Sequence, residues 1–333
     1  MAYEPIFDHT RKKDEPVSGD ARQDARDGKG YAYDQKNEIP IRVNVALATG
    51  RPLLVRGPSG SGKSSLAASV AHIMDWNYFE FVVTSRTQAR DLLWRFDMLE
   101  RLSDAEARHP LNPLSPETIA RVREKERYIE PGVLWWAFDP DSAPLRGARE
   151  KFSDLDLARP PTHMPYHKYA RSVILIDEID KADPDVPNDL LVPLGSLQFE
   201  VEDTDFSVKL ERENLKPPLI IITSNNEREL PPAFLRRCVT LFLQAPDDER
   251  LEQIAINRRG SNAENIKIYK ALLQAMSKPP EAVPADPPPS AAEYLDAIDA
   301  CLTLKVKPQE DDEVWNKVIR TTLWKQPEPD KKS

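Results

Sequence analysis

The 333-residue sequence has few cysteines and no long apolar run. Its two cysteines, Cys238 and Cys301, cannot build a disulfide framework, which favours a reducing compartment. No stretch approaches the roughly 18 apolar residues of a membrane-spanning helix. Residues 1–34 mix charges with glycine and lack the apolar segment of a secretory signal, so we interpret them as a mobile tail. These features predict a cytoplasmic protein without a membrane partner.

A large excess of charge is also absent, since 46 basic and 55 acidic side chains give a net charge of −9. This balance provides no general attraction to nucleic acid or anionic membranes, so a nucleic-acid partner is not expected. A hydrophobic content of 40% fits a globular protein, and the length suggests about two domains.

Glycine is scarce, with 11 residues against 31 prolines. Four of the glycines nevertheless fall within thirteen consecutive residues, at Gly50, Gly57, Gly60 and Gly62. Because glycine adopts backbone conformations that other residues avoid, the cluster predicts a segment with an unusual backbone path.

Five short apolar runs predict the strands of an α/β fold. The runs in the middle of the chain do not alternate with polar residues, which is typical of strands covered on both faces. Because helical segments separate the strands, we expect a parallel sheet flanked by helices. The predicted strands are residues 51–56, 78–83, 173–178, 219–223 and 239–243.

Helical patterns fill most of the remaining sequence. We predict helices over residues 63–74 and within 85–130, and an irregular proline-rich insert over about 131–165. After residue 246 only helical patterns remain: 248–259, 262–277, a helix opened by the capping box Ser290–Glu293, and 311–324. The predicted organisation is a core over 35–246, a helical domain over 247–326 and a tail over 327–333.

The glycine cluster contains the full pattern G-x-x-x-x-G-K-[ST], between a predicted strand and a predicted helix. In this pattern the backbone N–H groups and the helix N-terminus surround phosphate oxygens. Lys63 would contact the β- and γ-phosphates and Ser64 would bind Mg²⁺. The alternative is an ordinary turn between strand and helix. The predicted nucleotide-binding residues are Gly57, Pro58, Ser59, Gly60, Ser61, Gly62, Lys63, Ser64 and Ser65.

Two adjacent carboxylates, Asp177 and Glu178, end the third predicted strand. A carboxylate at the end of a buried strand is costly unless it is paired or binds a cation, so Asp177 is expected to hold Mg²⁺ with Ser64. Glu178 is then the candidate general base that activates water toward the γ-phosphate. The alternative is a solvated pair that caps a helix.

With these motifs in place, the chain resembles the AAA+ ATPases, and more narrowly their MoxR-like branch of prokaryotic chaperone ATPases. The resemblance rests on residues 43–57, 173–185 and 223–237 and extends over about 36–325. It implies an AAA+ type P-loop NTPase fold with a five-stranded parallel sheet and a small helical lid. It also implies ATP and Mg²⁺ as ligands, a homo-oligomer for which the resemblance favours a hexameric ring, and a protein client or adaptor.

The resemblance further assigns roles to residues after the fourth and before the fifth strand. Asn225 stands where the family places its sensor 1 residue, with Asn226 as a rival, although either could be a turn asparagine. The family supplies an arginine to the neighbouring subunit's γ-phosphate, and Arg237, then Arg236, is the candidate. A local ion pair with residues 247–249 is the alternative for these arginines.

Two segments leave open questions. The family often has a basic sensor 2 residue at the start of the third lid helix, but residues 287–293 contain no Arg or Lys. Arg258 or Arg259 could take that role, or the lid could sense nucleotide differently. Trp135 and Trp136 would either grip a polypeptide or pack in the core of the insert.

The sequence therefore predicts an ATPase that remodels or assembles a protein client or partner. Two other functions stay open: a DNA-acting AAA+ motor, and an ATP-bound regulatory switch in a bacterial conflict or antiphage system. The pair Asp177–Glu178 disfavours a switch without hydrolysis.

Overall fold

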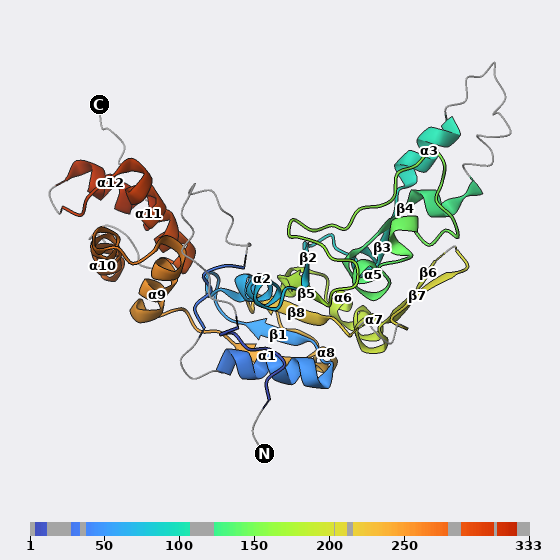
Figure 1. Cartoon of the computed structure of the whole chain (residues 1–333), viewed down its shortest axis with the longest axis horizontal. Coiled ribbons are helices and arrows are strands. Elements are labelled where there is room, and N and C mark those ends of the chain that lie inside the picture. The colour runs from blue at the N-terminus through green and yellow to red at the C-terminus, as the bar shows by residue number, and fades with distance from the viewer. Residues whose placement is uncertain are drawn as a thin grey trace. The chain divides into compact units, whose positions relative to one another are not determined.

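A computed structural model describes residues 4–11, 28–33, 38–106, 123–202, 204–211, 216–278, 288–309 and 312–324 (Figure 1). The chain divides into two compact units. The first comprises Met1–Ile6, Arg42–Val55 and Met74–Leu241, and the second comprises Phe7–Ile41, Arg56–Ile73 and Phe242–Ser333. Helix α1 (Glu38–Thr49) contributes residues to both.

A five-stranded parallel sheet with the order β2-β5-β8-β1-β9 forms the centre of the first unit, as predicted (Figure 1). Every residue of β5 and β8 is buried, which explains why these runs lack alternation. Val173 of β5 lies opposite Tyr78 of β2 on one side and Leu219 of β8 on the other. The strands are β1 (Leu53–Arg56), β2 (Asn77–Val82), β5 (Ser172–Asp177), β8 (Leu219–Ser224) and β9 (Val239–Phe242).

The segment between β2 and β5 differs from the prediction of helices over 85–130. It contains a small antiparallel sheet of β3 (Trp94–Phe96) and β4 (Ile129–Pro131). The α-helix α3 (Met98–Glu106) follows β3, and residues 107–122 lie outside the described part of the chain. Single 3-10 turns, η2 (Ala89–Leu92), η3 (Lys125–Tyr128) and η4 (Ala143–Leu145), complete the segment.

The aromatic part of the insert is a buried helix rather than an irregular loop. All six residues of α5 (Val133–Phe138) are buried, and the ring of Trp135 stacks on Phe206 with centroids 5.7 Å apart. Phe206 belongs to a hairpin of β6 (Gln198–Val201) and β7 (Phe206–Lys209), which the sequence analysis missed. Trp135 and Trp136 therefore pack in the core, so the polypeptide-gripping reading is not supported.

Four further short elements follow the strands of the first unit. Residues after β5 form η5 (Ile179–Lys181), α6 (Asp185–Asp189) and α7 (Leu191–Ser196), which leads into the hairpin. Between β8 and β9 lies α8 (Pro232–Arg237).

The second unit combines α2 (Lys63–Met74) with the four lid helices and an N-terminal segment. Tyr269, Tyr294 and Trp315 form part of the lid core. Residues 1–34 were expected to be a mobile tail, but Phe7 is only 1% exposed and contacts Tyr33, whose hydroxyl bonds Ser69 of α2. The lid helices are α9 (Asp248–Arg259), α10 (Ala263–Ser277), α11 (Ala291–Leu304) and α12 (Glu313–Thr322) (Figure 1).

Candidate functional site

The glycine loop of the second unit has the curled backbone that the phosphate-binding pattern predicts. Gly57, Gly60 and Gly62 all have positive φ angles, and α2 begins directly after them at Lys63. The Lys63 side chain is 6% exposed and its Nζ donates to the backbone oxygens of Gly57 (3.0 Å) and Pro58 (2.7 Å). The lysine is thus held over the loop whose N–H groups would surround a phosphate.

The start of the third lid helix lies against this loop. Ser290 is the N-cap of α11, and its N–H donates to the Glu293 carboxylate at 2.7 Å, which confirms the predicted capping box. A Cβ on Gly60 would overlap the Cβ of Ser290, so the contact requires glycine in the loop. A serine therefore occupies the place where the family often has a basic residue.

Arg258 and Arg259, the two candidates for a displaced sensor 2 role, both contact other residues of the second unit. Arg259 binds both carboxylate oxygens of Asp299, at 2.5 and 2.8 Å. Arg258 is buried, and its Cγ would be 2.8 Å from a Cβ placed on Gly30. Both side chains therefore contribute to packing of the lid.

In the first unit, Asp177 lies at the end of β5 and is 9% exposed. The Thr223 hydroxyl, from β8, donates to Asp177 Oδ1 at 2.5 Å. The same hydroxyl oxygen accepts the N–H of Glu178 at 2.9 Å. Thr223 therefore fixes both carboxylate residues, and the sequence analysis did not identify it. Its signal was a polar residue at the end of the apolar run 219–222.

Glu178 extends from a strained backbone position, with φ 61° and ψ 48° in the left-handed region. Its Oε1 accepts a hydrogen bond from Asn225 Nδ2 at 3.2 Å, and its Oε2 pairs with Lys181 Nζ at 2.6 Å. The bond to Glu178 raises the pKa of Lys181. Both carboxylate oxygens are thus positioned by neighbours, and Lys181 is a contact that sequence reasoning missed.

Asp180 fixes the backbone of the loop that carries the two sensor 1 candidates, Asn225 and Asn226. The Asp180 carboxylate is buried and accepts the backbone N–H groups of Asn225 (3.1 Å) and Glu227 (2.9 Å). Asn226 has φ 61° and is exposed, and its N–H bonds Ser224 Oγ. The loop after β8 therefore directs the Asn225 amide to Glu178.

Arg236 and Arg237 are exposed in the last turn of α8. The next residue but one, Val239, donates its N–H to the Pro52 oxygen at 2.8 Å. This bond places the end of α8 beside the amino end of β1. Among the described residues, neither arginine forms the local ion pair with residues 247–249 that was the alternative.

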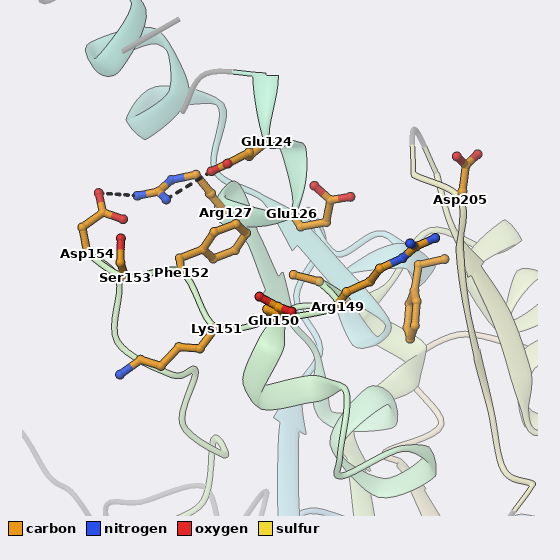
Figure 2. A pocket seen from close by; sticks show the side chains of 13 residues that line it. Glu124, Glu126, Arg127, Arg149, Glu150, Lys151, Phe152, Ser153, Asp154 and Asp205 are labelled. Carbon is orange, nitrogen blue, oxygen red and sulfur yellow. Dashed lines mark hydrogen bonds and ion pairs between the residues drawn. The ribbon is translucent and has the colours of Figure 1, made fainter. Parts of the chain in front are cut away.

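A cavity of about 1000 Å³ lies in the insert of the first unit (Figure 2). Arg127 is buried there between Glu124 (3.3 Å) and Asp154 (2.8 Å), and its guanidinium lies 4.9 Å from the ring centre of Phe152. These contacts tie η3 to the loop of residues 147–154. Arg127 therefore connects two parts of the first unit, and it lies in the segment that was expected to be helical.

The residues predicted to hold Mg²⁺ offer suitable donors. Asp177 provides a carboxylate and Ser64 a hydroxyl, and oxygen atoms of these kinds are the ligands that Mg²⁺ prefers. The described part of the chain contains no group of three or more His, Cys, Asp or Glu residues arranged to hold a metal.

Comparison with known proteins agrees with this fold. No curated protein matches the chain. None of the described helices is both long and apolar enough to cross a bilayer. A family model for the AAA domain of the dynein-related subfamily matches residues 52–238, which is more than half of the sequence and runs from the start of β1 to the end of α8. The chain therefore belongs to the AAA family of nucleotide-dependent ATPases, in the dynein-related subfamily.

Proposed function

We propose that the protein hydrolyses ATP with the residues of its glycine loop and of the ends of β5 and β8. The observation that carries this proposal is the pairing of Glu178 with Asn225 beside the buried Asp177. A binding module would need one carboxylate for the metal, whereas this arrangement adds a second carboxylate held by an amide. The strands β5, β8 and β1 are neighbours in one parallel sheet, and β1 leads in the sequence into the glycine loop.

Each residue of the proposed site has its own role in ATP hydrolysis. Lys63 would exchange its bonds to the loop oxygens for phosphate oxygens and neutralise their charge. Glu178 would accept a proton from the attacking water, and Asn225 would orient that water without adding charge. Ser64 and Asp177 would hold Mg²⁺, which supplies further neutralisation of the phosphates. Arg237, or Arg236, of a neighbouring copy would complete the charge stabilisation.

We also propose the MoxR-like role: a homo-oligomeric ring, hexameric by resemblance, that uses ATP to remodel or assemble a protein client. The sequence segments 43–57, 173–185 and 223–237 support this narrower assignment. The position of Arg237 supports the ring, because it lies beside the amino end of β1 whereas the glycine loop follows the carboxyl end. The net charge of −9 argues against DNA as the substrate.

Turnover of the purified chain tests the catalytic proposal. We expect Mg²⁺-dependent ATP hydrolysis that is lost on chelation and in Glu178→Gln, whereas Glu229→Gln, at an exposed position in the loop between β8 and α8, retains it. Equal turnover of wild type and Glu178→Gln would overturn the proposal and favour a binding switch. DNA-stimulated hydrolysis would instead favour a DNA-acting motor.

Assembly and client are tested with the same variant. Glu178→Gln with ATP and Mg²⁺ should hold the nucleotide-bound state, and the mass of the complex should be that of a ring. Monomers alone under these conditions would contradict the ring and the arginine in trans. Proteins that co-purify with the variant and are released by wild-type turnover are the candidate clients.

A further inference from the structure

A second basic side chain shares the surroundings of Arg237. A cavity of about 230 Å³ at the amino end of β1 is lined by Arg51 and Arg237. Its walls also include Cys238 and the apolar side chains of Leu191, Leu194 and Phe234. Arg236 does not line it. The cavity therefore distinguishes between the two arginines of α8, which the sequence could not do.

The two arginines present uncompensated positive charge. Both are exposed, no acidic residue lines the cavity, and no ion pair of either is found among the described residues. Like charges in one cavity repel, and the apolar walls weaken the screening by water. The arrangement is favourable once an anion binds, and the planar guanidinium groups match phosphate oxygens.

The phosphate loop of the same copy is not within reach of this pair. Arg51 precedes β1, whereas Gly57 follows it, and the four residues of the strand span about 13 Å. Arg51 and the phosphate loop are therefore separated by the length of β1. A ring interface that repeats head to tail brings this edge of one copy to the loop of the next.

We propose that Arg51 and Arg237 together form the site that one copy presents to the terminal phosphate of the nucleotide bound by the neighbouring copy. Arg51 is then a second phosphate-contacting arginine in trans. This inference rests on the proposed ATPase function and on its ring. It goes further by naming Arg51, to which the sequence analysis assigned no role, and it assigns the trans role to Arg237 rather than Arg236.

Steady-state turnover and nucleotide affinity of Arg51→Ala test the inference. We expect kcat to fall on the order of 10- to 100-fold, as for loss of a hydrogen bond to a charged group, with the Kd for ATP unchanged. Arg51→Lys should recover only part of the activity, because it keeps the charge but loses the planar fork. Arg86→Ala, which removes an exposed arginine away from the cavity, is the matched control and should turn over like wild type.

Mixing variants shows whether Arg51 acts in trans. Arg51→Ala retains an intact loop but should turn over about 10- to 100-fold more slowly than wild type. Lys63→Ala retains both arginines but should be inactive alone. In a 1:1 mixture about a quarter of the head-to-tail interfaces would combine an intact loop with an intact arginine pair. We expect activity to reappear at about that fraction, and Arg237→Ala should behave in the same way.

Three outcomes would overturn the inference. They are wild-type turnover of Arg51→Ala, an activity loss that the mixture does not restore, and a raised Kd for ATP in the variant itself. If Arg51→Ala does not assemble, the mixture is made with Arg51→Lys, and unrestored activity counts equally against the inference. Failure of the ATPase proposal is separate, because it would appear as equal turnover of wild type and Glu178→Gln.

Discussion

Thr223 offers the sharpest test of how the fold holds the two carboxylate residues. Its hydroxyl donates to Asp177 Oδ1 at 2.5 Å and accepts the Glu178 N–H at 2.9 Å, and the side chain is fully buried. Thr223→Val keeps the shape of the side chain and removes both hydrogen bonds. Thr223→Ser keeps the hydroxyl and removes only the methyl group.

The cost of Thr223→Val can be estimated from these contacts. Loss of a hydrogen bond to a charged carboxylate costs about 1.5–3 kcal/mol, and loss of the bond to the N–H costs about 0.5–1.5 kcal/mol. Burial of an extra methyl group returns about 0.8 kcal/mol. The expected loss in free energy of unfolding is therefore about 1–4 kcal/mol, which lowers the Tm by about 2–16 °C for a unit of this size.

Urea denaturation followed by tryptophan fluorescence measures this difference. The first unit contains Trp76, Trp94, Trp135 and Trp136, so the signal reports mainly on the unit that holds Thr223. We also expect ATP turnover to fall about 10-fold or more in Thr223→Val, because Asp177 and Glu178 lose their common anchor. Thr223→Ser should lose about 1 kcal/mol of packing and retain turnover. Identical stability and turnover of the two variants would refute the reasoning.

Three further predictions concern the second unit and the cysteines. Gly60→Ala should lower the free energy of unfolding more than Gly50→Ala does, and it should also weaken nucleotide binding. Both positions have positive φ, but only a Cβ at residue 60 would meet another side chain, that of Ser290. Equal losses of stability in urea denaturation would contradict this. Arg259→Ala should destabilise the lid by about 3 kcal/mol, because it leaves Asp299 unpaired. A double-mutant cycle with Asp299→Ala should give a coupling energy of about 1–3 kcal/mol. A coupling energy near zero would show that the pair does not stabilise the lid. Burial raises the pKa of Cys238 to about 12 and that of Cys301 to about 11, so both should stay protonated at pH 8 and react with a thiol reagent only in denaturant; rapid labelling of the native protein would contradict the burial.

The central sheet and the lid could be predicted because their signals are local. Unbroken apolar runs identify β5 and β8 within a residue, and the capping box at Ser290 identifies the start of α11. The strands β3 and β4 could not be found in this way. Trp94 pairs with Pro131 across a long sequence separation, so the partner is set by tertiary contacts rather than by either short segment.

The hairpin of β6 and β7 was also missed, although its sequence carries a recognisable pattern. In β6 and β7 the buried side chains of Phe199, Val201 and Val208 alternate with exposed ones, which is the pattern of a half-buried hairpin. Phe7 had no such pattern around it, because its burial depends on contact with Tyr33 from a distant part of the sequence. Composition alone therefore described the N-terminal segment too simply.

In the candidate site, the sequence predicts the types of the residues, whereas tertiary contacts determine how they are placed. The motifs identify Lys63, Asp177 and Glu178 by type, but the choice between Asn225 and Asn226 depends on a backbone turn. Asp180 fixes that turn by accepting two N–H groups, and its place within the run 177–181 does not reveal this role. Arg51 had no role assigned from the sequence, and it is the cavity shared with Arg237 that connects it to the proposed function.

The contact between the lid and the glycine loop differs in kind from the one that the family resemblance implies, because it involves no basic side chain. Residues 288–293 provide no cation, and Arg259 is held by Asp299. The start of α11 instead meets the glycine loop through the small side chain of Ser290, at a position where only glycine fits opposite it. Contact by shape is not screened by salt, whereas a contact by charge weakens as ionic strength rises. Coupling between loop and lid in this chain should therefore depend on the volume at residues 60 and 290 and remain insensitive to salt.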